Sequence, residues 1–141
     1  MDKEKAFTAS VDFVPSFNDT DPMGIVWHGT YIRFFEKARE VLFRSLHYGY
    51  KEMKESGYAY PVVDVHIKYR RPWLLEARAT VKVTLTEYEN RLVTEYEVID
   101  VKSNTLLTTA RIVQMAFDLK TREGLLECPA VLFEKLGVAK P

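Results

Sequence analysis

The sequence has few of the features that mark cross-linked, membrane-spanning or nucleic-acid-binding proteins. Its 141 residues include one cysteine, Cys128, so no disulfide can form within the chain. No stretch approaches the roughly 20 apolar residues of a membrane-spanning helix, and residues 1–5 lack the apolar core of a signal peptide. Basic and acidic residues number 20 each, and this zero net charge disfavours nucleic acid as a partner. The composition predicts a cytoplasmic protein with no membrane span.

Motifs for common cofactors are also missing from the sequence. We find no His/Cys/Asp/Glu cluster with metal-ligand spacing, no phosphate loop and no glycine-rich dinucleotide motif, so we expect no cofactor. Cys128 precedes Pro129 in a late, loop-like segment, and no histidine follows it in the chain. We therefore expect an inert thiol there. The length and the 47% hydrophobic content predict a single domain over residues 1–141 with a core of its own.

The hydrophobic pattern predicts one long helix and about five strands. Apolar residues recur at spacings of three and four over residues 27–47, which is typical of an amphipathic helix. Its expected apolar stripe consists of Tyr31, Phe34, Phe35, Ala38, Val41, Leu42 and Ser45. The expected strands are residues 6–17, 60–69, 77–88, 91–101 and 106–119, and residues 129–136 are expected to form a short helix.

An antiparallel sheet wrapped around that helix would cover both apolar faces, which predicts an α+β fold. An open sheet leaves edges to be paired or covered. Pairing two copies would extend the sheet, so we expect a homodimer or a dimer of dimers. His66, in strand 60–69, is expected to be a structural histidine, although an outward-facing His66 could meet the other subunit's site.

Residues 19–28, DTDPMGIVWH, hold a carboxylate just ahead of the expected helix. A helix N-terminus leaves about four N–H groups unpaired and carries partial positive charge, so it can hold a developing oxyanion. Asp21 beside such donors is a candidate nucleophile or general base for acyl transfer. Asp21 followed by Pro22 is also a common helix start, with the aspartate as the N-cap. The residues alone leave both interpretations open.

Residues 17–31, FNDTDPMGIVWHGTY, with residues 34–39, FFEKAR, resemble the signature of the 4-hydroxybenzoyl-CoA thioesterase family. The resemblance is greatest to the acyl-CoA thioester hydrolases associated with the Tol-Pal envelope system. It implies the hotdog fold and hydrolysis of an acyl-CoA to a carboxylic acid and free coenzyme A. Coenzyme A is then part of the substrate and not a cofactor. The resemblance also implies that Asp21 attacks the carbonyl or activates water.

The resemblance implies roles for further residues of the same segment. It sets the thioester carbonyl against backbone N–H groups near His28, whose ring either positions water or the acyl group or merely fills space. The expected substrate contacts are Gly24, Val26, Trp27, Tyr31 and Lys68. Trp27 could line the acyl pocket or lie in the core, with a slight preference for the core, and the same holds for Tyr31. The candidate cations for the coenzyme A phosphates are Lys68, Arg70, Arg71, Lys82 and Arg91.

Three alternatives compete with the Asp21 thioesterase. Glu36 could be the working carboxylate, because another hotdog branch uses a helix glutamate, but it falls on the expected polar face. A hotdog hydratase or dehydratase would need an Asp–His pairing with flanking residues that this sequence does not show. A non-catalytic module could bind acyl-CoA or an acyl-carrier protein, although the intact Asp21 and Gly24 argue against it.

Overall fold

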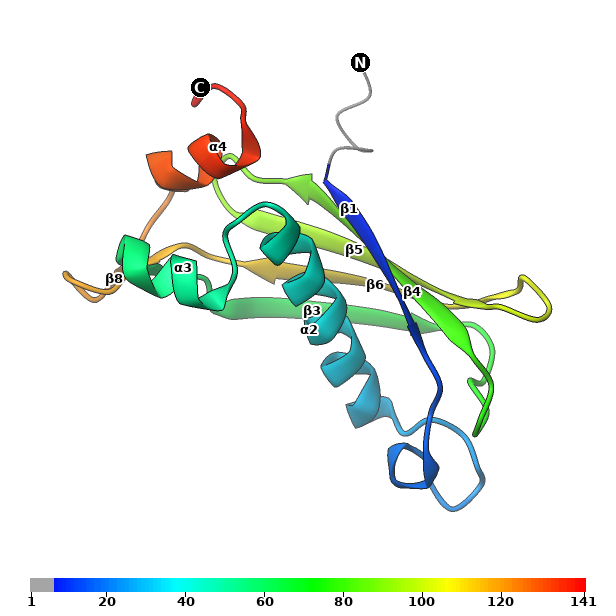
Figure 1. The fold of residues 1–141 in the computed structure, drawn as a ribbon. Helices are drawn as coiled ribbons and strands as arrows, with labels where there is room; N and C mark the ends of the chain where they lie inside the picture. Colours follow the sequence, from blue (N-terminus) through cyan, green and yellow to red (C-terminus); the bar gives the residue numbers. More distant parts are fainter. Residues whose placement is uncertain (1–6) are drawn as a thin grey trace.

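The computed structural model describes residues 7–141, which form an antiparallel sheet with one long helix lying across one face (Figure 1). The strands of this sheet are β1 (Thr8–Phe13), β3 (Val62–Tyr69), β4 (Ala79–Glu87), β5 (Leu92–Asp100) and β6 (Leu106–Gln114). The helical elements are η1 (Phe17–Asp19), α2 (His28–Ser45), α3 (Tyr50–Ser56) and α4 (Ala130–Leu136). The strand order is β1-β4-β5-β6-β3. The predicted α+β arrangement of about five antiparallel strands around one helix is confirmed.

The long helix α2 covers the sheet with most of the predicted stripe. Its buried residues are Thr30, Tyr31, Phe34, Phe35, Ala38, Leu42 and Phe43. The prediction was wrong for Val41, which is 43% exposed, and for Ser45. Phe43 lies about 100° around the helix from Leu42, on the side of Arg39, and is covered where α2 meets Tyr50 and Met53 of α3.

The inner face of the sheet follows the two-residue period of the sequence. Val81 pairs with Val98 and Val83 pairs with Tyr96 across β4 and β5, and all four are buried. The ring of Phe35 from α2 packs on Tyr96 with its centroid 4.7 Å away. Aromatic contacts between the helix and the sheet therefore form the centre of the core.

Two predicted strands differ from the observed ones. The first strand ends at Phe13 and not at residue 17, because η1 begins at Phe17; residue 6 lies outside the described residues. The last strand divides into β6 and β7 (Phe117–Asp118) at residues 115 and 116. The N–H of Met115 still donates to the carbonyl of Pro61, and the register continues from Val62–Gln114 to Ala59–Phe117, but Pro61 has no N–H with which to complete the ladder. The strand β7 pairs with β2 (Tyr58–Ala59) and β8 (Glu123–Gly124) in a second, small sheet.

The strand β3 forms one edge of the main sheet and is the most exposed of its strands. Asp64, His66 and Lys68 lie on the face away from α2, and Val65 and Ile67 lie on the face toward it, since Val65 pairs with the inward-facing Ile112. His66 is exposed in the single chain and lies on the outward face of β3. Its outward position is the one from which it could meet a second subunit.

Asp19 ties η1 to α2. Its carboxylate accepts hydrogen bonds from the N–H (2.8 Å) and the hydroxyl (3.0 Å) of Ser16. The same carboxylate forms an ion pair with Arg33 of α2. Its carbonyl accepts from the N–H of Trp27 and the hydroxyl of Thr30, both at 3.0 Å. Burial raises the pKa of Asp19, but the Ser16 hydrogen bonds and the Arg33 charge together hold it below the ordinary 3.8. The buried Asp19 thus fixes the loop that carries Asp21.

We expect Phe35→Ala to lower the free energy of unfolding by about 3–5 kcal/mol, because it removes a fully buried aromatic ring. The matched control is Val41→Ala on the exposed face of the same helix, which should cost less than about 1 kcal/mol. Urea denaturation followed by circular dichroism measures both. Equal losses for the two variants would contradict the described face of α2.

The Asp19 network predicts a pH-dependent difference between the wild type and Asp19→Asn. A carboxyl whose folded-state pKa is lowered stabilises the protein above its unfolded value of 3.8. That stabilisation disappears as the pH falls from about 3.8 through the folded-state pKa. Unfolding free energies of the two proteins should therefore differ more at about pH 6 than at about pH 3. A difference that does not change with pH would refute this role of the Asp19 charge.

Candidate functional site

The segment between η1 and α2 folds into a tight turn around Asp21. The N–H of Asp21 donates to the carbonyl of Ile25 at 2.8 Å, and the N–H of Gly24 donates to the carbonyl of Asp21 at 3.0 Å. Gly24 has a φ of +77°, a backbone conformation that glycine adopts without a steric penalty. Gly24 therefore closes the turn that presents the aspartate.

The carboxylate of Asp21 is oriented by its own turn. Its Oδ1 accepts hydrogen bonds from the N–H of Met23 at 2.9 Å and of Ile25 at 3.3 Å. The helix interpretation of Asp21-Pro22 was wrong, because α2 begins at His28 and its N-cap is Trp27. The local chemistry of aspartate explains the difference, since a short carboxylate readily bonds the amide two residues ahead.

A clamp from the segment before β4 holds this turn in place. The N–H of Val26 donates to the carbonyl of Trp73 at 2.7 Å, and the N–H of Leu75 donates to the carbonyl of Gly24 at 2.9 Å. Trp73 is fully buried, and its indole N–H donates to the carbonyl of Ala77 at 2.7 Å. The turn is thereby fixed to the core and not only to its flanking residues.

An open cavity of about 380 Å³ lies at this turn. Asp21, Val26, His28 and Tyr31, four of the predicted site residues, line it together. The other lining residues come from the turn and from the end of β3: Ile25, Tyr69, Arg70, Arg71 and Pro72. The structure thus brings the aspartate and the start of α2 to one cavity.

Tyr31 serves in the core and in the cavity wall at once. Its ring packs edge-on against Tyr69 at 5.1 Å and against Trp73 at 5.8 Å. Burial raises the pKa of Tyr31, so its hydroxyl stays protonated at neutral pH. Tyr69 was missed from the sequence, although its place before the flagged Arg70 and Arg71 could have indicated it.

Three of the expected substrate contacts lie outside this cavity lining. Gly24 shapes the turn, and Trp27 is 52% exposed, so the slight preference for Trp27 as a core residue was wrong. The Trp27 ring covers Gly29, where an added Cβ would come within 2.1 Å of it. The side chain of Lys68 lies on the opposite face of β3.

The first turn of α2 supplies donors at the same cavity. His28 is the first residue of the helix, and the Trp27 side chain preceding it has no acceptor that could cap the helix amides. The N-terminal amides of a helix carry partial positive charge. A carboxylate and an anion-stabilising helix end therefore meet at one opening, which is the arrangement that acyl transfer needs.

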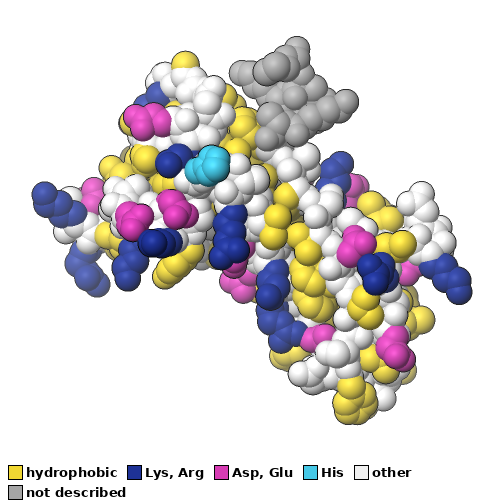
Figure 2. Space-filling view, in the orientation of Figure 1, with side chains coloured by type: hydrophobic (Ala, Val, Ile, Leu, Met, Phe, Trp, Pro, Cys, Tyr) yellow, Lys and Arg dark blue, Asp and Glu magenta, His cyan; other side chains and the backbone are white. Residues whose placement is uncertain are grey.

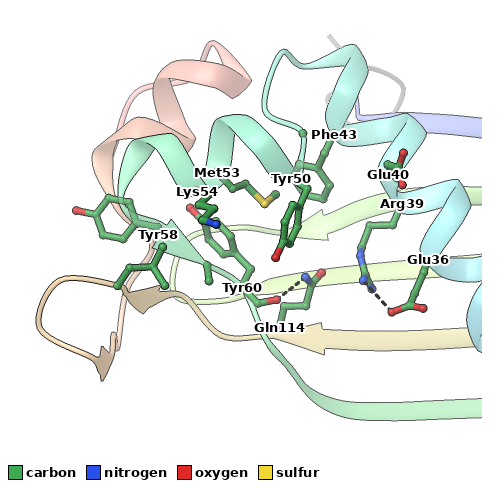
Figure 3. A pocket seen from close by; sticks show the side chains of 13 residues that line it. Glu36, Arg39, Glu40, Phe43, Tyr50, Met53, Lys54, Tyr58, Tyr60 and Gln114 are labelled. Atoms are coloured by element: carbon green, nitrogen blue, oxygen red, sulfur yellow. Dashed lines mark hydrogen bonds and ion pairs between the residues drawn. The ribbon is translucent and has the colours of Figure 1, made fainter.

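Glu36 lies apart from Asp21. Its side chain is 56% exposed, its carboxylate lies 3.9 Å from the guanidinium of Arg39, and it lines a second cavity with Arg39, Tyr60 and Gln114 (Figure 3). The residues described from 7 to 141 contain no group of three metal-ligating side chains. Burial raises the pKa of the Cys128 thiol to about 11, consistent with an inert cysteine.

The surface carries both charges without a dominant sign. On the face drawn in Figure 2, basic and acidic side chains are interspersed among apolar ones. No helix in the described part of the chain is long and apolar enough to cross a membrane.

Residues 15–136 match the family model described as the thioesterase-like superfamily. The chain is 30% identical over 134 residues to the putative esterase sll0410 of Synechocystis, covering 94% of this chain and 80% of that protein. It is 26% identical over 102 residues to the acyl-CoA thioester hydrolase YbgC of Escherichia coli, covering 72% and 76% of the two chains.

The fold is shared with solved structures. The crystal structure of Slr0204, a 1,4-dihydroxy-2-naphthoyl-CoA thioesterase from Synechocystis, superposes with a TM-score of 0.81 at 23% identity. The alignment covers 92% of this chain and 96% of that one. The match over residues 15–136, the relatives and the wrapped helix agree: the chain belongs to the thioesterase-like superfamily and has its hotdog fold.

Proposed function

We propose that this protein hydrolyses acyl-CoA thioesters with Asp21 as its working carboxylate. The observation that carries the proposal is that Asp21 and His28, the first residue of α2, line the same cavity. Asp21 either attacks the thioester carbonyl, forming a mixed anhydride that water then opens, or takes a proton from the attacking water. In both routes the acyl carbon gains an oxygen and the coenzyme A sulfur leaves with a proton.

The amides at the start of α2 stabilise the oxyanion that forms in either route. Loss of one such donor typically raises the barrier of acyl-transfer reactions by about 2.7–4 kcal/mol. The hydrogen bonds from Met23 and Ile25 to Oδ1 hold the Asp21 carboxylate in one orientation before substrate binds. The turn therefore contributes positioning, and the helix end contributes charge stabilisation.

Arg70 and Arg71 bind the phosphates of coenzyme A in this proposal. Both line the Asp21 cavity, and both backbone N–H groups donate to the carbonyl of Leu107 at 2.9 Å, which fixes the strand end that carries them. Guanidinium groups suit phosphate because they donate in pairs. Lys68 and Lys82, also considered from the sequence, lie outside this cavity lining.

The relatives favour hydrolysis over the competing functions. YbgC is named an acyl-CoA thioester hydrolase, which supports a thioester as the substrate and disfavours a hydratase or a non-catalytic module. Within one subunit Glu36 lines the second cavity and Asp21 lines the cavity at the start of α2, so a variant of each carboxylate decides between the two alternatives.

Asp21→Asn should lower kcat by at least about 10²-fold, because the amide keeps the shape of the side chain but cannot act as base or nucleophile. Release of coenzyme A, followed with a thiol reagent over a panel of acyl-CoAs, measures the loss. The matched control Glu36→Gln should retain most of the activity. Wild-type turnover in a correctly folded Asp21→Asn protein would refute the assignment, and a dead Glu36→Gln would favour the alternative carboxylate.

The exposed edge β3 supports a homodimer formed by strand pairing. The N–H of Arg70 donates inward to Leu107, and N–H directions alternate along a strand, so the amides of Val65 and Ile67 point to the free edge. Such an edge is prone to pair with another chain. We place the twofold axis of the dimer at His66, so that the β3 strands of the two subunits run antiparallel side by side. In this register Val65 lies opposite Ile67 of the partner subunit.

Opposite charges within β3 favour this register. With the axis at His66, Asp64 lies opposite Lys68 of the partner subunit, and the symmetry repeats the pair. Sliding one strand by two residues breaks both pairs and sets Lys68 opposite His66 or Val62 of the partner subunit. In the first case Asp64 faces Arg70 of the partner subunit, which lies beyond the end of β3. Opposite charges directly across a strand pair stabilise it, and like charges destabilise it.

Lys68→Glu should weaken the dimer, because it sets two carboxylates opposite each other twice. The double variant Asp64→Lys with Lys68→Asp should restore it. Light scattering at micromolar concentration should give at least twice the 16.4 kDa chain mass for the wild type and for the double variant. A double variant no better than the single one would contradict the register, and a stable active monomeric wild type would contradict the dimer.

The same register predicts cross-linking at the axis. His66 would face His66 of the partner subunit in a non-hydrogen-bonded pair, with Cα atoms about 4.5 Å apart. A disulfide tolerates that separation. His66→Cys should therefore oxidise to a covalent dimer on a denaturing gel, and the buried Cys128 in the unaltered chain should not.

A further inference from the structure

The second cavity lies between α2, α3 and the end of β6 and measures about 480 Å³. Its walls are largely aromatic and apolar, with Phe43, Tyr50, Met53, Tyr58 and Leu119 among the lining residues. This volume falls within the range of small-molecule sites. It lies on the helix side of the sheet, as the Asp21 cavity does, because Gln114 alternates with the inward-facing Ile112.

Two buried polar atoms at this cavity have no hydrogen-bond partner among the described residues: Nη1 of Arg39 and Oε1 of Gln114. Gln114 is 5% exposed, and its Nε2 donates to the carbonyl of Tyr60 at 2.7 Å, which fixes its orientation. Figure 3 shows the Arg39 and Gln114 side chains extending toward each other from α2 and β6. Buried polar groups in folded proteins are nearly always paired with protein or with ordered water, so these two atoms call for a partner, either a water molecule or a ligand.

The chemistry of the two atoms restricts that ligand. Arg39 can only donate a hydrogen bond, and Oε1 of Gln114 can only accept one. A hydroxyl group satisfies both, since its oxygen accepts from Arg39 while its hydrogen is donated to Gln114. A methyl group satisfies neither, and a carboxylate would leave the Gln114 oxygen without a donor.

The paired edge strands decide which active site this cavity serves. With the axis at His66, Tyr69 of one subunit lies opposite Val63 of the partner subunit. Next to that Val63, Val62 of the partner subunit pairs with Gln114 on the adjacent strand β6. The Gln114 of the partner subunit is then two strand spacings, or about 10 Å, from Tyr69. Within one subunit, Tyr69 pairs with Thr108, and the run along β6 to Gln114 is about 20 Å. The partner's cavity is the nearer one.

We propose that this cavity holds the acyl group of a thioester bound at Asp21 of the partner subunit, and that Arg39 and Gln114 bind a hydroxyl on that acyl group. The proposal rests on the proposed function and names its substrate class: hydroxyacyl thioesters in preference to the unsubstituted acyl chains. Phe43 and Met53 contact the apolar part of the acyl group, and the two polar residues select its hydroxylated end.

A matched substrate pair tests the selection. The wild type should hydrolyse 8-hydroxyoctanoyl-CoA with a kcat/KM about tenfold or more above that for octanoyl-CoA, the size expected for a hydrogen bond to a charged group. Equal values would overturn the proposal, because a cavity holding only water would not discriminate. Failure to hydrolyse any thioester would instead refute the proposed function.

Variants separate recognition from folding. Arg39→Met keeps the apolar stem and removes the donors, so the ratio of the two kcat/KM values should fall to about one. Gln114→Leu should act in the same direction. The matched control is Arg44→Met, the same change at an exposed position of the same helix, which should keep the full preference. An unchanged preference in Arg39→Met would overturn the proposal even if Gln114→Leu fails to fold.

Mixed dimers test which subunit supplies the cavity. Asp21→Asn and Arg39→Met chains with different tags are co-expressed, and the heterodimer is purified. If the cavity serves the partner, the intact Asp21 faces an intact cavity across the interface, and the heterodimer regains the hydroxyl preference. If the cavity serves its own subunit, the intact Asp21 works only with the Arg39→Met cavity, and an absent preference would overturn the cross-subunit assignment.

Discussion

The burial of Trp73 connects every part of the molecule on which the candidate site depends. Its ring packs against Tyr31 and Phe34 of α2, its indole N–H donates to the carbonyl of Ala77 ahead of β4, and its own carbonyl accepts the N–H of Val26. One residue thereby joins the long helix, the sheet and the turn of Asp21. The turn of Asp21 is partly exposed to solvent, yet its geometry is set by a fully buried side chain.

Asp19 is the second residue that holds the Asp21 turn in place. It does so through hydrogen bonds and an ion pair, whereas Trp73 does so mainly through packing. Its carboxylate and carbonyl together bind Ser16, Trp27, Thr30 and Arg33, so the chain is held on both sides of Asp21. A short turn anchored at both ends has little freedom left to lose when substrate binds. Preorganisation of this kind favours catalysis because the carboxylate does not need to be repositioned during the reaction.

The sequence predicted most of the architecture because the periodic segments carry their own information. Val81, Val83 and Leu85 alternate with polar residues, and they are buried as that alternation requires. The position of Asp21 was less accessible, because a turn closed by Gly24 and a helix start capped by aspartate share the same residues. The break after Gln114 depends on Pro61 lying opposite it in the ladder without an N–H, which no pattern within residues 106–119 reveals. The unpaired atoms of Arg39 and Gln114 likewise emerge only when residues far apart in sequence meet.

The contrast between the two tryptophans gives this protein a built-in optical reporter. Trp27 lies half exposed on the first turn of α2, with its ring 4.9 Å from that of His28, whereas Trp73 is shielded completely. The Trp27 indole is in contact with water and the Trp73 indole is in an apolar environment. The two residues therefore differ in emission wavelength and in their access to dissolved quenchers. The red-shifted, quenchable component comes from Trp27 beside the Asp21 cavity, and the shielded component comes from Trp73 in the core. Ligand arrival and unfolding can thus be followed as distinct spectral changes in the unlabelled chain.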